Sequence, residues 1–158
     1  MISSAILLIV LVAILSTFES VSTAQAYQAD RIQNLDQMRG VLNRMTKDLR
    51  QATAVDETVS TATTITFTTP INGVSTQIVY AASGTTLTRK VGSATAFPVL
   101  KNLASTSVFT YVTADYVTGI QWVGMNLQVT PARTPDTTLV LDSEVNLRNR
   151  TSALEGST

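Results

Sequence analysis

The residues of this chain that could carry out chemistry are few. The chain has no histidine and no cysteine, which removes the commonest general base, the commonest metal ligand and any thiol nucleophile together. Asp142 and Glu144 form the strongest remaining pattern, because they would share one face of a β-strand. Such a pair could serve a glycosidase. We favour two solvated carboxylates on an exposed face, and we predict a non-enzyme with no catalytic residue, no cofactor and no metal ligand.

Aromatic and basic residues allow a second kind of site, one that stacks on sugars or nucleic acid. Trp122, Tyr111 and Tyr116 could provide such a platform. Basic residues do not interleave with them, so we favour packing within or on a sheet. The basic residues of the first third are Arg39, Arg44, Lys47 and Arg50, and they share their segment with Asp36 and Asp48. Eleven basic residues balance eleven acidic ones, and no specific nucleic-acid partner is predicted.

The element that precedes these residues is a strongly apolar segment. Residues 1–18 contain no charged side chain, and a helix through them is apolar on every side. Such a helix would be about 27 Å long, marginal for a bilayer core of roughly 30 Å. We predict a transmembrane or filament-core segment over residues 1–25. Its candidate assembly residues are Ile6, Leu7, Leu8, Ile9, Val10, Leu11, Val12, Ile14 and Leu15.

A cleaved secretory signal is the alternative for this segment. Residues 24–26, Ala-Gln-Ala, match a small-x-small cleavage site after an apolar run. Two features argue against cleavage. No basic residue precedes the apolar run, and Glu19 lies between that run and the site. We therefore favour a helix that continues through the site.

Residues 26–54 carry an apolar stripe at helical spacing. The residues predicted to pack this helix on a sheet are Ile32, Leu35, Met38, Leu42, Met45 and Leu49. Arg44 and Asp48 could form an i,i+4 ion pair on the other face. No proline precedes Pro70, and Gly40 is the only glycine before Gly73. A single helix of about 80 Å is therefore expected from Met1 to Ala54.

Residues 55–151 read as a β-rich head. Thr-, Val- and Ile-rich runs alternate with turn signals, and Ile65 and Phe67 would share one strand face. Pro70 is expected to end that strand. The strand candidates are residues 64–68, 77–80, 86–89, 108–112, 119–129 and 138–147. We predict an α+β fold in which one antiparallel meander packs on the amphipathic half-helix with its Thr-rich face in water, followed by a loose tail over residues 152–158.

Most of the chain resembles the type IV pilin superfamily, specifically minor pilins of the PilW type and J-type pseudopilins of type II secretion. The helix end over residues 39–52 finishes in D-L-R-Q-A, which is similar to the end of that family's helix. The runs I-T-F at 65–67, I-V-Y-A at 78–81 and L-T-R at 87–89 are similar to its first three strands. The segment 140–149, which ends in L-R-N, is similar to its closing strand. The order and spacing of these patterns together carry the resemblance.

The beginning of the chain departs from that family. A basic leader, a glycine before the cleavage point and a motif of the form F-T-L-x-E are all missing, and Ala5 stands where the family has an assembly glutamate. Glu19 lies too far along the chain to replace it. We expect that Met1 lies about half a dozen residues inside the family's mature N-terminus, through a mis-set start or a truncation. A divergent subunit that lacks the glutamate is the alternative.

The resemblance implies a structural role without an active site. The expected protein is a minor pilin or pseudopilin of a pilus or secretion-type filament. Its expected partners are other pilin or pseudopilin subunits, an inner-membrane assembly platform and the membrane through the N-terminal helix. The expected location is the cytoplasmic membrane, with the head outside, and then the extracellular or periplasmic filament. The alternative is a secreted or membrane-anchored extracellular β-domain that acts as a binding or adhesion module.

Overall fold

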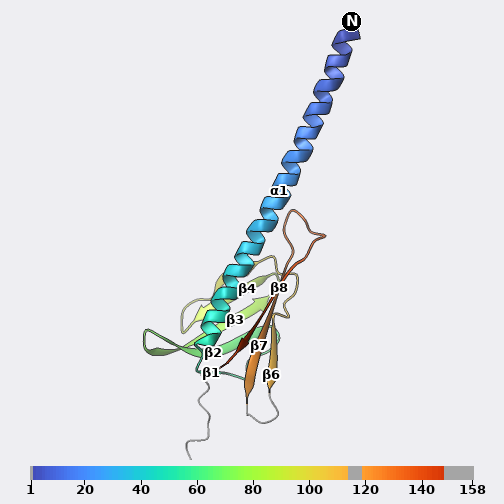
Figure 1. Ribbon diagram of the computed structural model, residues 1–158. Coiled ribbons are helices and arrows are strands. Elements are labelled where there is room, and N and C mark those ends of the chain that lie inside the picture. Colours follow the sequence, from blue (N-terminus) through green and yellow to red (C-terminus); the bar gives the residue numbers. More distant parts are fainter. Residues whose placement is uncertain (1, 114–118, 148–158) are drawn as a thin grey trace, which may run out of the picture.

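One long helix leads into a β-rich head. The computed structural model describes residues 2–113 and 119–147, apart from the side chains of residues 2–10 and 13. Helix α1 spans Ile2–Arg50, which corresponds to about 74 Å at 1.5 Å per residue. Its N-terminal half stands clear of the head, and its C-terminal part lies along the strands (Figure 1). The predicted α+β class, a long helix packed on antiparallel sheet, is confirmed.

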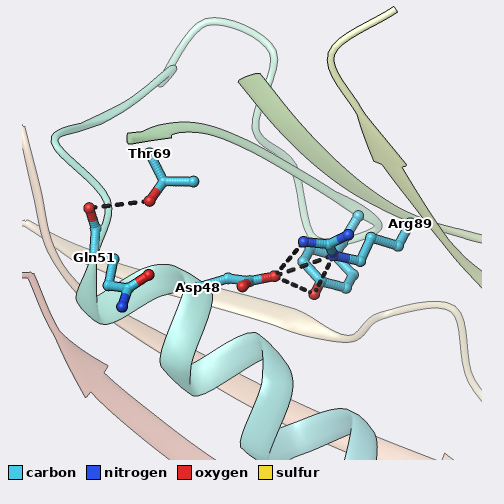
Figure 2. A network of polar contacts seen from close by, with 5 residues as sticks. Asp48, Gln51, Thr69 and Arg89 are labelled. Atoms are coloured by element: carbon cyan, nitrogen blue, oxygen red, sulfur yellow. Dashed lines mark hydrogen bonds and ion pairs between the residues drawn. The ribbon is translucent and has the colours of Figure 1, made fainter. Parts of the chain in front are cut away.

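Helix α1 ends four residues earlier than predicted, at Arg50. The amide of Thr53 donates a hydrogen bond to the Thr68 carbonyl at 2.8 Å, and Ala54–Val55 then forms strand β1 against β2. Figure 2 shows the hydroxyl of Thr69 donating to the backbone carbonyl of Gln51 at 3.2 Å, just past the helix end. Strand pairing with a distant segment therefore takes over where local helix propensity alone would continue.

The first sheet has five antiparallel strands in the order of the sequence. After β1 these are β2 (Thr64–Ile71), β3 (Val74–Ser83), β4 (Thr86–Val91) and β5 (Phe97–Lys101). Strand β2 runs past Pro70, contrary to the prediction, because Asn72 and Gly73 make the turn with φ of 51° and 79°. Two positive φ values in a two-residue hairpin loop match the twist of the flanking strands.

The second sheet has three antiparallel strands: β6 (Phe109–Thr113), β7 (Ile120–Val129) and β8 (Leu139–Asn146). The expected single meander is thus divided in two. The chain turns after β5 at Asn102, whose φ is 59°. The amides of Val108 and Phe109 both donate to the carbonyl of Ala62, at 2.9 Å each, which fastens the start of β6 beside the first sheet. Strands β1 and β5 were not predicted.

The core lies between the two sheets and one side of α1. Met38, Leu42, Met45 and Leu49 are buried there, and Leu35 packs partly against them. Ile32 is 59% exposed, so its predicted packing was wrong. Ile32, Leu35 and Met38 are spaced three residues apart, and each step of three residues falls about 60° short of a full helical turn. Ile32 therefore lies about 120° around the helix from Met38. The Thr-rich face is not wholly in water either, since the core also covers Thr66 and Thr69.

The two glycines before and after the helix end should respond oppositely to alanine. A Cβ on Gly40 would have no atom within 4 Å, and a helical Gly→Ala change removes about 1 kcal/mol of unfavourable propensity. Gly40→Ala should therefore raise the free energy of unfolding by about that amount. Gly73→Ala should lower it by about 1–2 kcal/mol, because alanine resists positive φ. Urea denaturation measures both, and a destabilised Gly40→Ala variant would contradict the prediction.

Candidate assembly surface

The projecting part of α1 exposes a run of large apolar side chains. We call this set the exposed stripe, and every member is more than half exposed, with Phe18 at 74%. Its members are Leu11, Ile14, Leu15, Phe18 and Val21. Val12, exposed to 59%, lies beside it. A contiguous apolar surface of this kind on a soluble monomer marks an interaction site.

The spacing of the exposed stripe is that of a helix–helix seam. Leu11, Ile14, Phe18 and Val21 are separated by three, four and three residues, as at the a and d positions of a heptad. The centre of the stripe lies about 150° around the helix from the residues that α1 buries in the head, at about 100° per residue. The stripe therefore does not extend the head's own core. It presents a separate surface on a different side of the same helix.

Two threonines among these apolar residues are hydrogen-bonded within the helix. The hydroxyl of Thr17 donates to the Ile14 carbonyl at 2.8 Å, and that of Thr23 donates to the Glu19 carbonyl at 2.8 Å. Hydroxyls that bond back to the preceding turn do not need a partner from outside the helix. Neither hydroxyl therefore opposes the burial of this segment.

The predicted assembly residues fall into two groups. Leu11, Val12, Ile14 and Leu15 are exposed on the projecting helix. The side chains of Ile6, Leu7, Leu8, Ile9 and Val10 lie outside the described residues, although their backbone is part of α1. A search of the described residues finds no helix with the length and apolar character needed to span a bilayer.

A buried polar network holds the other end of α1 to the first sheet (Figure 2). Asp48 Oδ2 accepts hydrogen bonds from the Tyr80 hydroxyl at 2.8 Å, from Arg89 Nη2 at 2.9 Å and from Arg89 Nε at 3.1 Å. The side chains of Asp48 and Arg89 are 16% and 10% exposed. The predicted Arg44–Asp48 pair was therefore wrong. One feature of the sequence could have indicated that Asp48 faces the head. It lies between Met45 and Leu49, two of the apolar residues predicted to pack on the sheet.

Two tyrosines of the head should make the folded protein less stable at alkaline pH. Burial raises the pKa of Tyr80, and its hydrogen bond to Asp48 raises that pKa further. Burial also raises the pKa of Tyr111 to about 12, and its hydroxyl lies 2.9 Å from each of the Thr61 and Thr64 carbonyls. In the unfolded chain both phenols ionise near pH 10.

The free energy of unfolding should accordingly fall as pH rises above about 10, because the folded protein then holds more protons than the unfolded one. The stabilisation is complete below the pKa of the unfolded tyrosines and is lost as pH rises through the folded values. Urea denaturation at pH 8, 10 and 11 measures the slope. Tyr111→Phe should flatten it, and a profile unchanged by that substitution would count against the prediction.

Of the residues considered for chemistry, Asp142, Glu144 and Trp122 share the outer face of the second sheet, and Tyr111 does not. Asp142 and Glu144 lie exposed on β8, where Asn126 Nδ2 donates to Asp142 Oδ1. Trp122 is 37% exposed on β7. Tyr111 instead points its hydroxyl to backbone carbonyls near the first sheet, so it does not extend a platform with Trp122. Tyr116 lies outside the described residues.

No family model matches the chain, no curated protein matches it, and no solved structure matches it.

Proposed function

We propose that this chain is a structural subunit, a minor pilin or pseudopilin, of a type IV pilus or type II secretion-like filament, and that it assembles through α1. The observation that supports this most directly is the exposed stripe on a helix that stands clear of its own head. The sequence resemblance to that superfamily points the same way. In this function the helix is the working part and no active site is required.

Association of helices would remove the exposed stripe from its surroundings. Each fully buried Leu, Ile, Val or Phe side chain gains about 1.5–3 kcal/mol on leaving water. Where the starting environment is lipid, close packing and satisfied polar groups supply the gain instead. The internally bonded Thr17 and Thr23 meet the second condition. The partners we propose are other pilin or pseudopilin subunits, delivered from the cytoplasmic membrane by an inner-membrane assembly platform to a periplasmic or extracellular filament.

The experiment uses the full chain, purified in detergent and then transferred to detergent-free buffer. We expect regular assemblies in negative-stain micrographs, with residues 11–25 protected from hydrogen exchange relative to the chain in detergent. A chain that stays monomeric, alone and when mixed with candidate pilin partners, would remove the support for a filament subunit. It would favour the alternative, an extracellular β-domain that binds through its head, for which the exposed Trp122 is the relevant feature.

A further inference from the structure

The outer face of the second sheet carries acidic charge only. Strands β6, β7 and β8 contain no lysine and no arginine. We call this surface the acidic sheet face, and its exposed members are Thr110, Val112, Trp122, Val140, Asp142, Glu144 and Asn146. Trp122 stands between Val112 and Asn146 in the strand register, and Glu144 lies across from Gly124. The face therefore combines an aromatic ring with two carboxylates.

The polar side chains at the centre of the acidic sheet face are held in place. A Cβ on Gly124 would lie 2.8 Å from the Thr110 hydroxyl oxygen, so the Thr110 side chain packs over this glycine on the neighbouring strand. Gln128 Nε2 donates to Asn126 Oδ1 at 2.8 Å, and Asn126 in turn donates to Asp142. Within residues 2–113 and 119–147, no ion pair engages Asp142 or Glu144. Their charges are thus available to a cationic partner.

A complementary surface lies on α1. Arg44, Lys47 and Arg50 are exposed on the side of the helix that faces away from the core, each within about 60° of Lys47, and we call this the basic helix face. Asp36 pairs with Arg39 at 3.6 Å. Asp48, the other acid of this segment, is turned inward to Arg89. In the described part of the chain, Arg44, Lys47 and Arg50 consequently have no ion-pair partner.

The two faces cannot neutralise each other within one molecule, because each points away from the core that both elements share. They can meet between two copies. We propose that the acidic sheet face of one copy docks on the basic helix face of the next, with Asp142 and Glu144 beside Arg44 and its neighbours. This inference rests on the proposed filament function and adds to it a contact between heads.

The chemistry of the two faces suits such a contact. Guanidinium groups bind carboxylates through paired hydrogen bonds and stack on tryptophan rings, and Trp122 supplies a ring next to Asn146. Because the two surfaces differ, the contact is heterologous. A heterologous contact that does not close into a ring repeats along an open chain of copies. The contact would thereby set the order of heads along a filament whose helices pack separately.

The absence of cysteine allows a direct test by cross-linking. Full-length chains carrying Asn43→Cys, within the basic helix face, are mixed with chains carrying Asn146→Cys, on the acidic sheet face, and oxidised. We expect a disulfide-linked heterodimer well above the homodimers of either variant alone. Chains with Ser75→Cys, exposed on the distant β2–β3 hairpin, replace Asn146→Cys as the matched control.

Charge reversal then identifies the cause of the contact. Arg44→Glu in the first chain, or Asp142→Arg in the second, should each lower the cross-linking yield about fivefold. The two reversals together should restore it, and added salt should lower the wild-type yield. Yields equal to the Ser75→Cys control, or indifferent to charge reversal, would overturn the inference. Filaments that form without this cross-link would overturn it alone, whereas a cross-link without filaments would count against the filament function.

Discussion

Asp48→Ala is expected to lower the free energy of unfolding by about 3–5 kcal/mol, the usual cost of leaving one partner of a buried ion pair uncompensated. Without the carboxylate, the guanidinium of Arg89 stays buried, and both it and the Tyr80 hydroxyl lose their hydrogen bonds to Asp48 Oδ2. The effect should appear as a lower urea midpoint in a full-length chain kept in detergent. Because Asp48 lies on α1 and Arg89 on β4, the substitution should also loosen the helix from the head.

Two further variants separate the buried pair from general charge effects. Asp36→Ala removes an exposed carboxylate from the same helix and should change the free energy of unfolding by no more than about 0.5 kcal/mol. The double variant Asp48→Leu with Arg89→Met removes both charges and should recover much of the loss, since paired apolar replacements are often neutral. An Asp48→Ala chain as stable as Asp36→Ala would show that the network contributes little.

Phe18→Asp is expected to abolish helix-mediated assembly while the head stays folded. Phe18 is the most exposed member of the exposed stripe and belongs to its a/d-like positions. A carboxylate there would have to leave water without a partner, which costs several kcal/mol or forces it to take up a proton. We expect the variant to remain in the supernatant after detergent removal and to lose the hydrogen-exchange protection of residues 11–25. The near-UV circular dichroism of the head should not change.

Ser20→Asp provides the matched control. Ser20 is exposed on the same projecting segment but lies about 160° around the helix from Phe18. It introduces the same charge at almost the same height, so a seam along the exposed stripe should tolerate it. If Ser20→Asp blocked assembly as completely as Phe18→Asp, the helix would pack on all sides, and the seam would be wrong. If Phe18→Asp assembled normally, the exposed stripe would not be the assembly surface.

Much of the architecture follows from local patterns in the sequence. The long helix follows from a segment in which proline is absent and glycine occurs once, and from apolar residues at spacings of three and four. The alternation around Ile65 and Phe67, and the turn at Gly84, predict the strands and the β3–β4 hairpin correctly. These signals are readable because helix and strand periods, and the φ preference of glycine, act over a few residues.

Some features of the candidate site could likewise be predicted from the sequence, and others could not. The exposed stripe is visible in the sequence as apolar residues at spacings of three and four, although its placement relative to the head is not. Sequence neighbours alone suggested the wrong ion-pair partner for Asp48, because its actual partner, Arg89, is 41 residues away. Because Asp48 pairs with Arg89, Arg44 has no ion-pair partner among the described residues. The acidic sheet face forms only when β6, β7 and β8 pair.

The sequence by itself determined that the chain forms a long helix followed by antiparallel strands, and that the N-terminal part of this helix is apolar. Only the tertiary structure decided that the strands divide into two sheets, that Ile32 faces outward and that Asp48 faces Arg89. The physical reason is the range of the forces concerned. Backbone periodicity and turn preferences are local, whereas core packing and buried ion pairs depend on which distant segments meet and on how closely they exclude water.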